Sequence, residues 1–347
     1  MESRYVKRLV QEIEEWGAFF SAPALDTIYL GGGTPSVLSV NSLRAISRAI
    51  RLACSTAGML EATIEVNPGT LTSSWLDAAR QEGWSRISLG VQALDTALLH
   101  SIGRVHDASD GIFAVELCKD AGFERISADL LLGAPGQRLE RVLEDAKSLI
   151  QAGVEHLSIY LLDLDKPCII KSEVENGKAE LPDEGLVADA YISLQEFLPK
   201  LGFVQYEISN YSRPGRHSIH NMRYWLRRPY IGMGPGAASN IGDCRWSESE
   251  NIKEWLEARA EPEIQALSPQ EAMAEIPLLA LRTCGGLDWG SLSREAATKG
   301  LSNVVSKWET ALAPFVDGGF LAQEGDTLRL TAKGMLLSNQ IFQVFVD

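Results

Sequence analysis

The sequence has no long apolar run, which excludes a membrane-spanning helix of ordinary length. No stretch reaches the roughly 18 consecutive apolar residues that a span needs, although hydrophobic residues make up 45% of the 347 positions. Residues 1–20 show a helical pattern with acidic residues between the apolar ones, unlike a secretory signal peptide. We therefore expect a cytoplasmic protein with one large domain and a smaller one.

Cysteines are few and scattered, which excludes a metal site built from neighbouring thiols. No two of them lie closer than 40 positions, whereas zinc and iron–sulfur sites use cysteines a few positions apart. An odd, dispersed set also argues against a disulfide framework. We expect reduced thiols that pack as small hydrophobic groups; they are Cys54, Cys118, Cys168, Cys244 and Cys284.

Acidic residues outnumber basic residues in this sequence. The chain has 32 lysines and arginines against 46 aspartates and glutamates, a net charge of -14. Such a surface repels phosphate backbones and anionic lipids unless a local basic patch intervenes. We therefore expect no nucleic-acid partner.

Short apolar runs alternate with helical patterns through the first half of the chain. Gly83, Gly122 and Gly153 fall where helix C-terminal caps belong. Strand, turn, helix and glycine in succession indicate an α/β fold with a parallel sheet or barrel. An additional helix at 3–20 precedes the first run. The predicted strands are 27–30, 62–66, 86–89, 126–132 and 156–162.

Polar residues stand at the ends of these strands or, for Arg104 and His106, one helical step further on. In a (β/α) barrel such positions face one mouth, so we expect them to converge on one ligand, although each alone would suit a cap or a turn. Glycines after the first strand allow backbone N–H groups to approach a carboxylate, ribose or phosphate. The residues are Gly31 to Thr34, Glu65, Asn67, Gln92, Arg104, His106, Asp129 and Gln137.

Two common glycine-loop explanations fail on spacing. A G-x-G-x-x-G loop starting at Gly31 would need glycine at position 36, where Ser36 stands, and no nucleotide P-loop lysine follows. The segment 232–237, "GMGPGA", fits G-x-G-x-x-A formally. Pro235 inside it predicts a glycine-rich loop instead of a Rossmann turn.

Eight phrases together carry a family resemblance. The chain resembles the oxygen-independent coproporphyrinogen III oxidase-like radical SAM family, specifically its heme-chaperone branch. The resemblance implies a partial (β/α) barrel of radical SAM type at 1–170, a barrel extension at 171–246, and a smaller C-terminal α+β winged-helix-like domain at 247–347. The phrases are "DTIYLGGGTPSVLS", "ATIEVNPGTL", "RISLGVQALD", "IGRVHDASD", "DLLLGAPGQ", "HLSIYLL", "YEISNYSRPG" and "HNMRYW".

The resemblance also implies the binding residues. The S-adenosylmethionine site would comprise Gly32, Gly33, Thr34, Glu65, Gln92, Arg104 and Asp129. Backbone N–H groups and Arg104 suit the ligand's carboxylate, and Glu65 or Asp129 suits its hydroxyls or cationic groups.

The HNxxYW motif of the heme-chaperone branch is matched by His220, Asn221, Tyr224 and Trp225. An imidazole can ligate iron and aromatic rings can flank a porphyrin. In this context we favour heme contact over a loop histidine beside core aromatics. A zinc site at His217 and His220 lacks a third ligand nearby.

The chain departs from the family at its cluster loop. The C-x-x-x-C-x-x-C segment that holds a [4Fe-4S] cluster is absent from these residues, so we expect no radical catalysis from the chain as written. Either the missing strand and loop are encoded upstream of Met1, or this form has lost radical chemistry. Because loss of the first strand would expose a sheet edge, we expect the first explanation to hold.

Three functional hypotheses remain open. The first is a heme chaperone-like protein that binds S-adenosylmethionine and heme, favoured by the HNxxYW motif. The second is an oxidase that decarboxylates porphyrinogen propionates, and the third is a cluster-free heme-binding pseudoenzyme. Expected partners are heme or porphyrin, heme-accepting proteins and, transiently, a membrane.

Overall fold

The computed structural model describes residues 1–165, 168–257 and 262–346. It contains two compact units: Met1–Gln205 with Ser209–His220, and Tyr206–Ile208 with Asn221–Asp347. The boundary at His220 falls inside the HNxxYW motif. The three-part domain division expected from the sequence stays a prediction.

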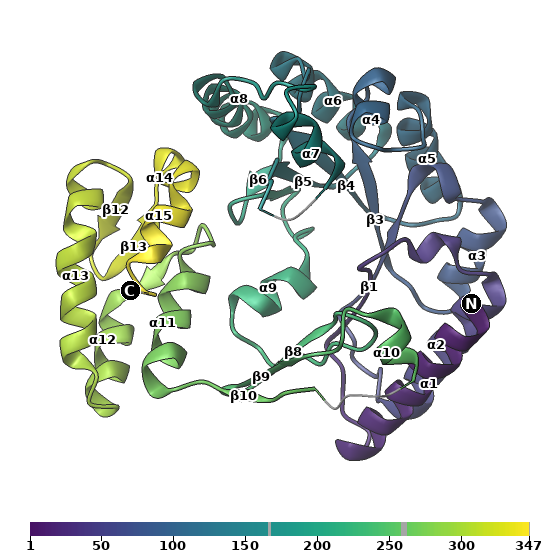
Figure 1. Cartoon of the computed structure of the whole chain (residues 1–347), viewed down its shortest axis with the longest axis horizontal. Coiled ribbons are helices and arrows are strands. Elements are labelled where there is room, and N and C mark those ends of the chain that lie inside the picture. The colour runs from purple at the N-terminus through teal and green to yellow at the C-terminus, as the bar shows by residue number, and fades with distance from the viewer. Residues whose placement is uncertain (166–167, 258–261, 347) are drawn as a thin grey trace. The chain divides into compact units, whose positions relative to one another are not determined.

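A seven-stranded sheet forms the frame of the first unit (Figure 1), in the order β1-β2-β3-β4-β5-β7-β6. β1 to β5 are parallel neighbours, whereas β7 and β6 continue the sheet antiparallel. The five predicted parallel strands are confirmed. Their bounds are β1 Thr27–Leu30, β2 Glu61–Val66, β3 Arg86–Gln92, β4 Arg125–Leu132 and β5 His156–Leu161, followed by β6 Val204–Gln205 and β7 Asn210–Ser212.

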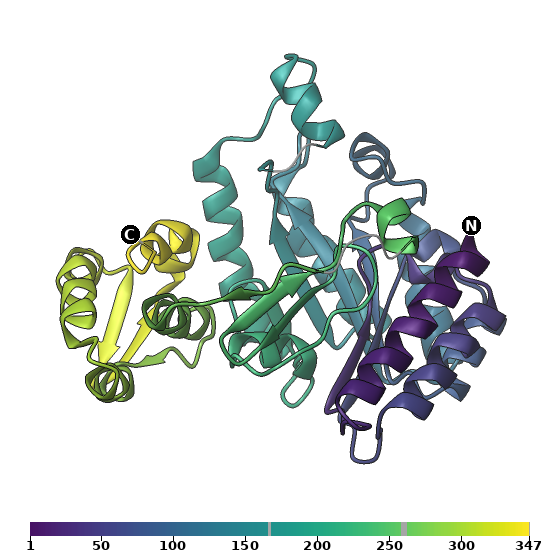
Figure 2. The same ribbon diagram turned by 60° about the horizontal axis from the view of Figure 1, so that its bottom comes forward.

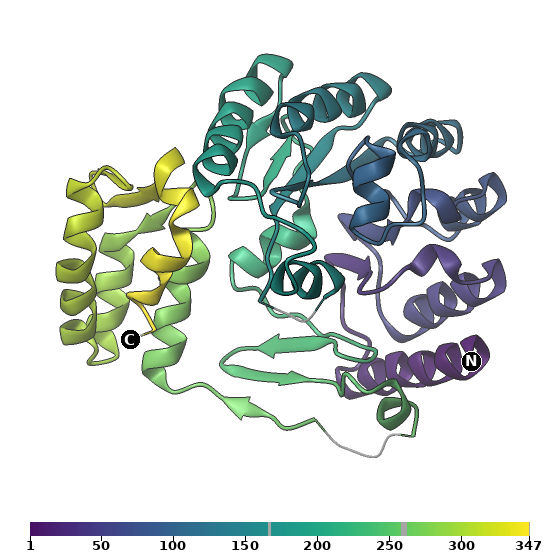
Figure 3. The same ribbon diagram turned by 45° about the horizontal axis from the view of Figure 1, so that its top comes forward.

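The longer helices between these strands lie on one side of the curved sheet (Figure 3), whereas α7 extends away from it (Figure 2). Gly83, Gly122 and Gly153 have positive φ angles of 94°, 82° and 116°, so the predicted glycine caps are confirmed. The helices are α1 Glu2–Phe19, α2 Val40–Ala53, α3 Ser73–Gln81, α4 Thr96–Ser101, α5 Ala108–Asp120, α6 Leu139–Ala152, α7 Ile169–Glu175 and α8 Glu184–Phe197, with 3₁₀ turns at Pro35–Val37, Pro68–Thr70 and Leu198–Leu201.

The first helix packs along α2 (Figure 2). Val6, Leu9 and Ile13 are buried on one face, as their helical spacing predicts. Gly17 allows the close approach, since a Cβ there would come 2.5 Å from the Cβ of Ala53. The predicted N-terminal helix is confirmed as an outer helix of the first unit.

The parallel strands have one apolar and one polar face. On β2, Ala62, Ile64 and Val66 are buried on one face, while Glu61, Thr63 and Glu65 alternate with them. The same alternation continues along the next strands. The polar set there is Arg86, Ser88, Arg125, Ser127, Asp129, His156 and Ser158. The inner face of this sheet therefore carries charge.

The second unit contains two three-stranded sheets, β10-β9-β8 and β11-β13-β12. As predicted, residues 232–237 form a glycine-rich loop, and a Cβ on Gly232 would come 2.2 Å from the carbonyl oxygen of Ala238. The elements are α9 Ile219–Trp225, which begins in the first unit, β8 Ala238–Ile241, β9 Cys244–Ser247, α10 Ile252–Leu256, β10 Gln265–Ala266, α11 Pro269–Ala280, β11 Leu287–Asp288, α12 Trp289–Thr298, α13 Ser302–Asp317, β12 Leu321–Glu324, β13 Thr327–Leu330, α14 Ala332–Leu336 and α15 Ser338–Gln343.

Candidate functional site

The glycine turn after β1 is shaped around one carboxylate. Gly32 has a φ of 83°, and its N–H donates to Glu65 Oε2 over 3.0 Å. A Cβ on Gly31 would come within 2.7 Å of the same carboxylate, whereas a Cβ on Gly33 would meet open space. Thr34 precedes the 3₁₀ turn at Pro35–Val37. The first two glycines are thus required by Glu65, and Gly33 presents open backbone.

Glu65 receives a second donor from β1. The Tyr29 hydroxyl donates to Oε1 over 2.6 Å, so each carboxylate oxygen has one protein donor. A carboxylate can accept about four hydrogen bonds, which leaves acceptor capacity for a ligand. Glu65 is therefore an oriented acceptor at the carboxyl end of β2.

Asp129 lies at the inner face of β4. Burial raises the pKa of its carboxyl to about 6, although the hydrogen bond with Ser158 lowers it; the negative charge of Glu65 adds to the rise, while Arg86 and Arg104 oppose it. Glu65 and Arg104 therefore lie near enough to Asp129 for their charges to act on its carboxyl. The structure thus gathers the expected acids and the expected arginine at one region of the sheet.

Gln92 ends β3 in a strained conformation. Its φ is 67°, and the pairing of β3 with β4 shifts between Leu89 and Gln92. A non-glycine residue in this region costs about 1 to 3 kcal/mol and persists only when its surroundings impose it. The strain sets Gln92 apart from an ordinary strand end, at the position where a ligand contact was expected.

Two other residues predicted for the site make hydrogen bonds to nearby backbone. His106 is buried and its Nε2 lies 3.2 Å from the carbonyl oxygen of Val91. The Gln137 side chain accepts from the N–H groups of Gly133 and Ala134 and donates to the Leu131 carbonyl. Both residues therefore shape loops beside the site.

His220 packs on β1 within the first unit. Its Nδ1 and Thr27 Oγ1 are hydrogen-bonded at 2.9 Å, and its ring stacks on Tyr29 with centroids 4.9 Å apart. Burial lowers the pKa of the imidazole to about 4, so the ring is neutral near pH 7.

The remaining motif residues belong to the second unit. The ring of Tyr224 meets that of Tyr230 edge to face at 4.5 Å, and the Arg282 guanidinium lies over Trp225, 4.5 Å from its centroid. Asn221 stands beside them on α9. The motif therefore divides into a histidine that packs on β1 and two partly buried aromatic rings whose contacts lie in the second unit.

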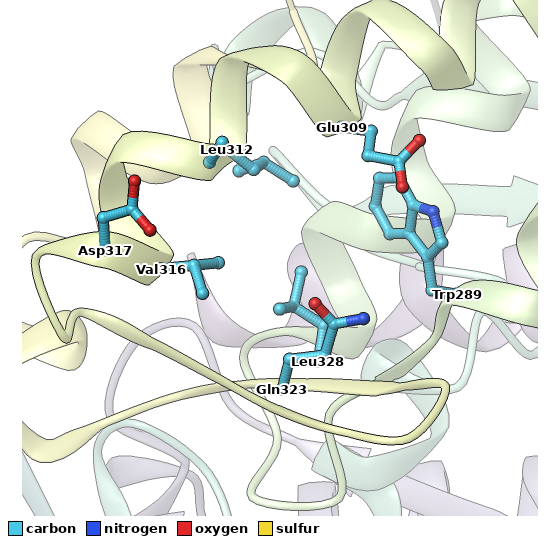
Figure 4. A pocket seen from close by; sticks show the side chains of 8 residues that line it. Trp289, Glu309, Leu312, Val316, Asp317, Gln323 and Leu328 are labelled. Carbon is cyan, nitrogen blue, oxygen red and sulfur yellow. The ribbon is translucent and has the colours of Figure 1, made fainter.

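The second unit also contains a pocket of about 260 Å³. Leu312, Val316 and Leu328 supply apolar surface, and Glu309 and Asp317 place acids beside it (Figure 4). None of the predicted site residues lines it. A group of three or more His, Cys, Asp or Glu side chains able to hold a metal ion is not found among the described residues.

Four polar residues of the inner sheet face were not predicted: Tyr29, which contacts Glu65, and Glu61, Arg86 and His156, which begin β2, β3 and β5. The available signal was period-two alternation of polar residues in "EATIEV" and "RISLGVQ". Reading these segments as apolar runs hid the charged inner face.

Comparisons with known proteins agree with this architecture. Residues 1–159 match the Radical SAM superfamily, and residues 267–337 match the HemN C-terminal domain. The solved structure of coproporphyrinogen III oxidase from Escherichia coli aligns with a TM-score of 0.85 and 22% identity, covering 99% of this chain and 83% of that one. The fold is thus that of a radical SAM protein, and the predicted fold class is confirmed.

Proteins with similar sequences identify the family within the radical SAM proteins. The chain is 32% identical to Heme chaperone HemW of Lactococcus lactis, with 99% of this chain and 89% of the relative covered. It is 31% identical to the Bacillus subtilis protein of that name, with 99% and 91% covered. The chain therefore belongs to the heme chaperone HemW family, as the resemblance predicted. None of the described helices combines the length and apolar composition that a bilayer crossing needs.

Proposed function

We propose that this chain is a heme chaperone-like protein that binds S-adenosylmethionine at the carboxyl ends of β1 to β4 and binds heme through its HNxxYW motif. The observation that carries the proposal is the carboxylate of Glu65, oriented by Tyr29 and Gly32 beside an open glycine turn. A family whose relatives are named heme chaperones supplies the ligand class.

Each polar group has a counterpart on S-adenosylmethionine. Exposed backbone at Gly33 and the guanidinium of Arg104 suit the ligand's carboxylate, and Glu65 suits the ribose hydroxyls or the amine. Gln92 offers an amide on a strained backbone, and Asp129 offers an acid that exchanges its proton near pH 6. Thr34 lies at the end of the turn.

The [4Fe-4S] cluster that the family implies does not fit the cysteines of this chain. Cys118 is buried in α5, and Cys54 is buried at the end of α2. The other three, Cys168, Cys244 and Cys284, are dispersed along the sequence. No step of the proposed function therefore runs through a cluster.

Heme binding by His220, Asn221, Tyr224 and Trp225 is part of the proposal. The neutral imidazole is in the state that ligates iron, and the two aromatic side chains offer ring surface of the kind that porphyrins contact. The name of the relatives, heme chaperone, supports transfer of heme to acceptor proteins as part of this proposal. A transient membrane association stays a prediction from the sequence. The oxidase alternative has support from fold likeness only.

Calorimetric titration with S-adenosylmethionine tests the proposed site. Glu65→Gln should lower the affinity by about tenfold or more, because a hydrogen bond to a charged group contributes about 1.5 to 3 kcal/mol. Glu144→Gln, on the exposed face of α6, is the matched control and should bind like the wild type. Equal affinity in wild type and Glu65→Gln would remove Glu65 from the site.

A further inference from the structure

A continuous series of contacts joins the HNxxYW histidine to the acid at the glycine turn. The His220 ring stacks on Tyr29, and the Tyr29 hydroxyl donates to Glu65. The three residues come from α9, β1 and β2, and all belong to the first unit. The histidine and Glu65 are thus joined through one intervening side chain.

The Tyr29 ring is held at three places. Its hydroxyl meets Glu65 at 2.6 Å, and one face meets the imidazole with an interplanar angle of 25°. Its edge lies against the turn, since a Cβ on Gly31 would come 2.6 Å from Tyr29 Cε1. Removal of the imidazole would free one face of the ring and allow the hydroxyl to leave Oε1 part of the time.

His220 is itself fixed by two neighbours. Thr27, two residues before Tyr29 on the same face of β1, holds Nδ1. Glu61 accepts from the backbone N–H groups of Ile219 at 3.0 Å and His220 at 3.1 Å, and it pairs with Arg125 at 3.0 Å. Because Glu61 anchors the backbone, the imidazole can be removed without releasing the start of α9.

We propose that His220 is a positioning residue of the S-adenosylmethionine site, which orients Glu65 through the ring and hydroxyl of Tyr29. This inference rests on the proposed function of that site and assigns to the histidine a task separate from contact with heme. A preorganised carboxylate binds its ligand with a smaller loss of side-chain freedom, so the imidazole contributes affinity without touching the ligand.

A double-mutant cycle on S-adenosylmethionine affinity tests the proposal. His220→Ala should weaken binding by about fivefold and Tyr29→Phe by about tenfold, and the double variant should be no weaker than Tyr29→Phe alone. His217→Ala, which removes an exposed imidazole three positions earlier, should bind like the wild type. Multiplicative effects in the double variant, or unchanged affinity in His220→Ala, would overturn the proposal.

A ligand-free measurement separates this inference from the proposed function. With ¹³C-labelled histidine, the ring signals of His220 are identified by their loss in His220→Ala. Glu65→Gln should shift those signals, and the shift should vanish when Tyr29 is phenylalanine in both proteins. Ring signals of His220 that stay unchanged in Glu65→Gln would overturn the positioning role. Absence of S-adenosylmethionine binding by the wild type would instead refute the proposed function, and the ring signals would still decide whether His220 and Glu65 are coupled through Tyr29.

Discussion

Gly31 lies against the carboxylate of Glu65 so closely that a Cβ at position 31 would come within 2.7 Å of Oε2. The turn and the acid at the end of β2 are therefore one structural unit. Tyr29 closes it from the other side, because its ring edge would meet the same Cβ at 2.6 Å.

This contact predicts different outcomes for two neighbouring glycines. Gly31→Ala should destabilise the protein by about 1 to 3 kcal/mol, because the turn must shift to admit the methyl group. Gly33→Ala should change stability by much less, since its Cβ would meet open space. Urea unfolding of both variants provides the comparison, and equal losses would show that the turn does not pack on Glu65 as described.

The buried carboxylate of Glu61 on β2 predicts that Glu61→Gln lowers the stability of the protein strongly. Glu61 is buried, pairs with Arg125 and receives the first N–H groups of α9. Breaking a buried ion pair by removing one partner costs about 3 to 5 kcal/mol. Glu144→Gln at the exposed Arg141 pair should cost under about 1 kcal/mol. Similar unfolding midpoints for the two variants would contradict the anchoring role of Glu61.

Asp129 should make stability fall as pH rises. Its pKa is about 6 in the folded protein, above the value of about 3.9 for an unfolded chain. Between these values the folded state binds more protons, so stability decreases from about pH 4 to about pH 6. The free energy of unfolding of Asp129→Asn should therefore rise by about 2 to 3 kcal/mol relative to that of the wild type over that interval. A constant difference between the two proteins would mean that Asp129 is not perturbed.

His220 should produce the opposite slope. Its folded pKa of about 4 lies below the unfolded value of about 6.5, so its contribution is present above pH 6.5 and is lost as pH falls toward 4. In His220→Asn this dependence should disappear, and the stability deficit of the variant should grow as pH rises. Unfolding curves of the two proteins at pH 4.5, 6 and 7.5 measure this difference in stability. The same pH dependence in both proteins would rule out a buried neutral imidazole.

Much of the frame was predictable from local sequence. The five parallel strands follow from apolar runs, and Gly83, Gly122 and Gly153 mark helix ends because an αL cap favours glycine. The predicted strand ends also supplied Glu65 near the end of β2 and Gln92 at the end of β3, since parallel strands bring their carboxyl ends to one edge.

The contacts of His220 could not be predicted in the same way. The hydrogen bond between Thr27 and His220 joins residues 193 positions apart, and no local pattern encodes such a pairing. The positive φ of Gln92 is likewise imposed by its surroundings, because propensity disfavours it. The short strands β6 and β7 depend on pairing with β5 and carry little signal of their own.

Titration of heme into the purified chain, followed by the Soret band, tests the central claim most directly. The account predicts saturable binding of about one heme per chain, with a band that His220→Ala weakens or shifts and that His217→Ala leaves unchanged. A band that does not saturate, or one with the same position and affinity in His220→Ala, would contradict heme binding through the HNxxYW motif.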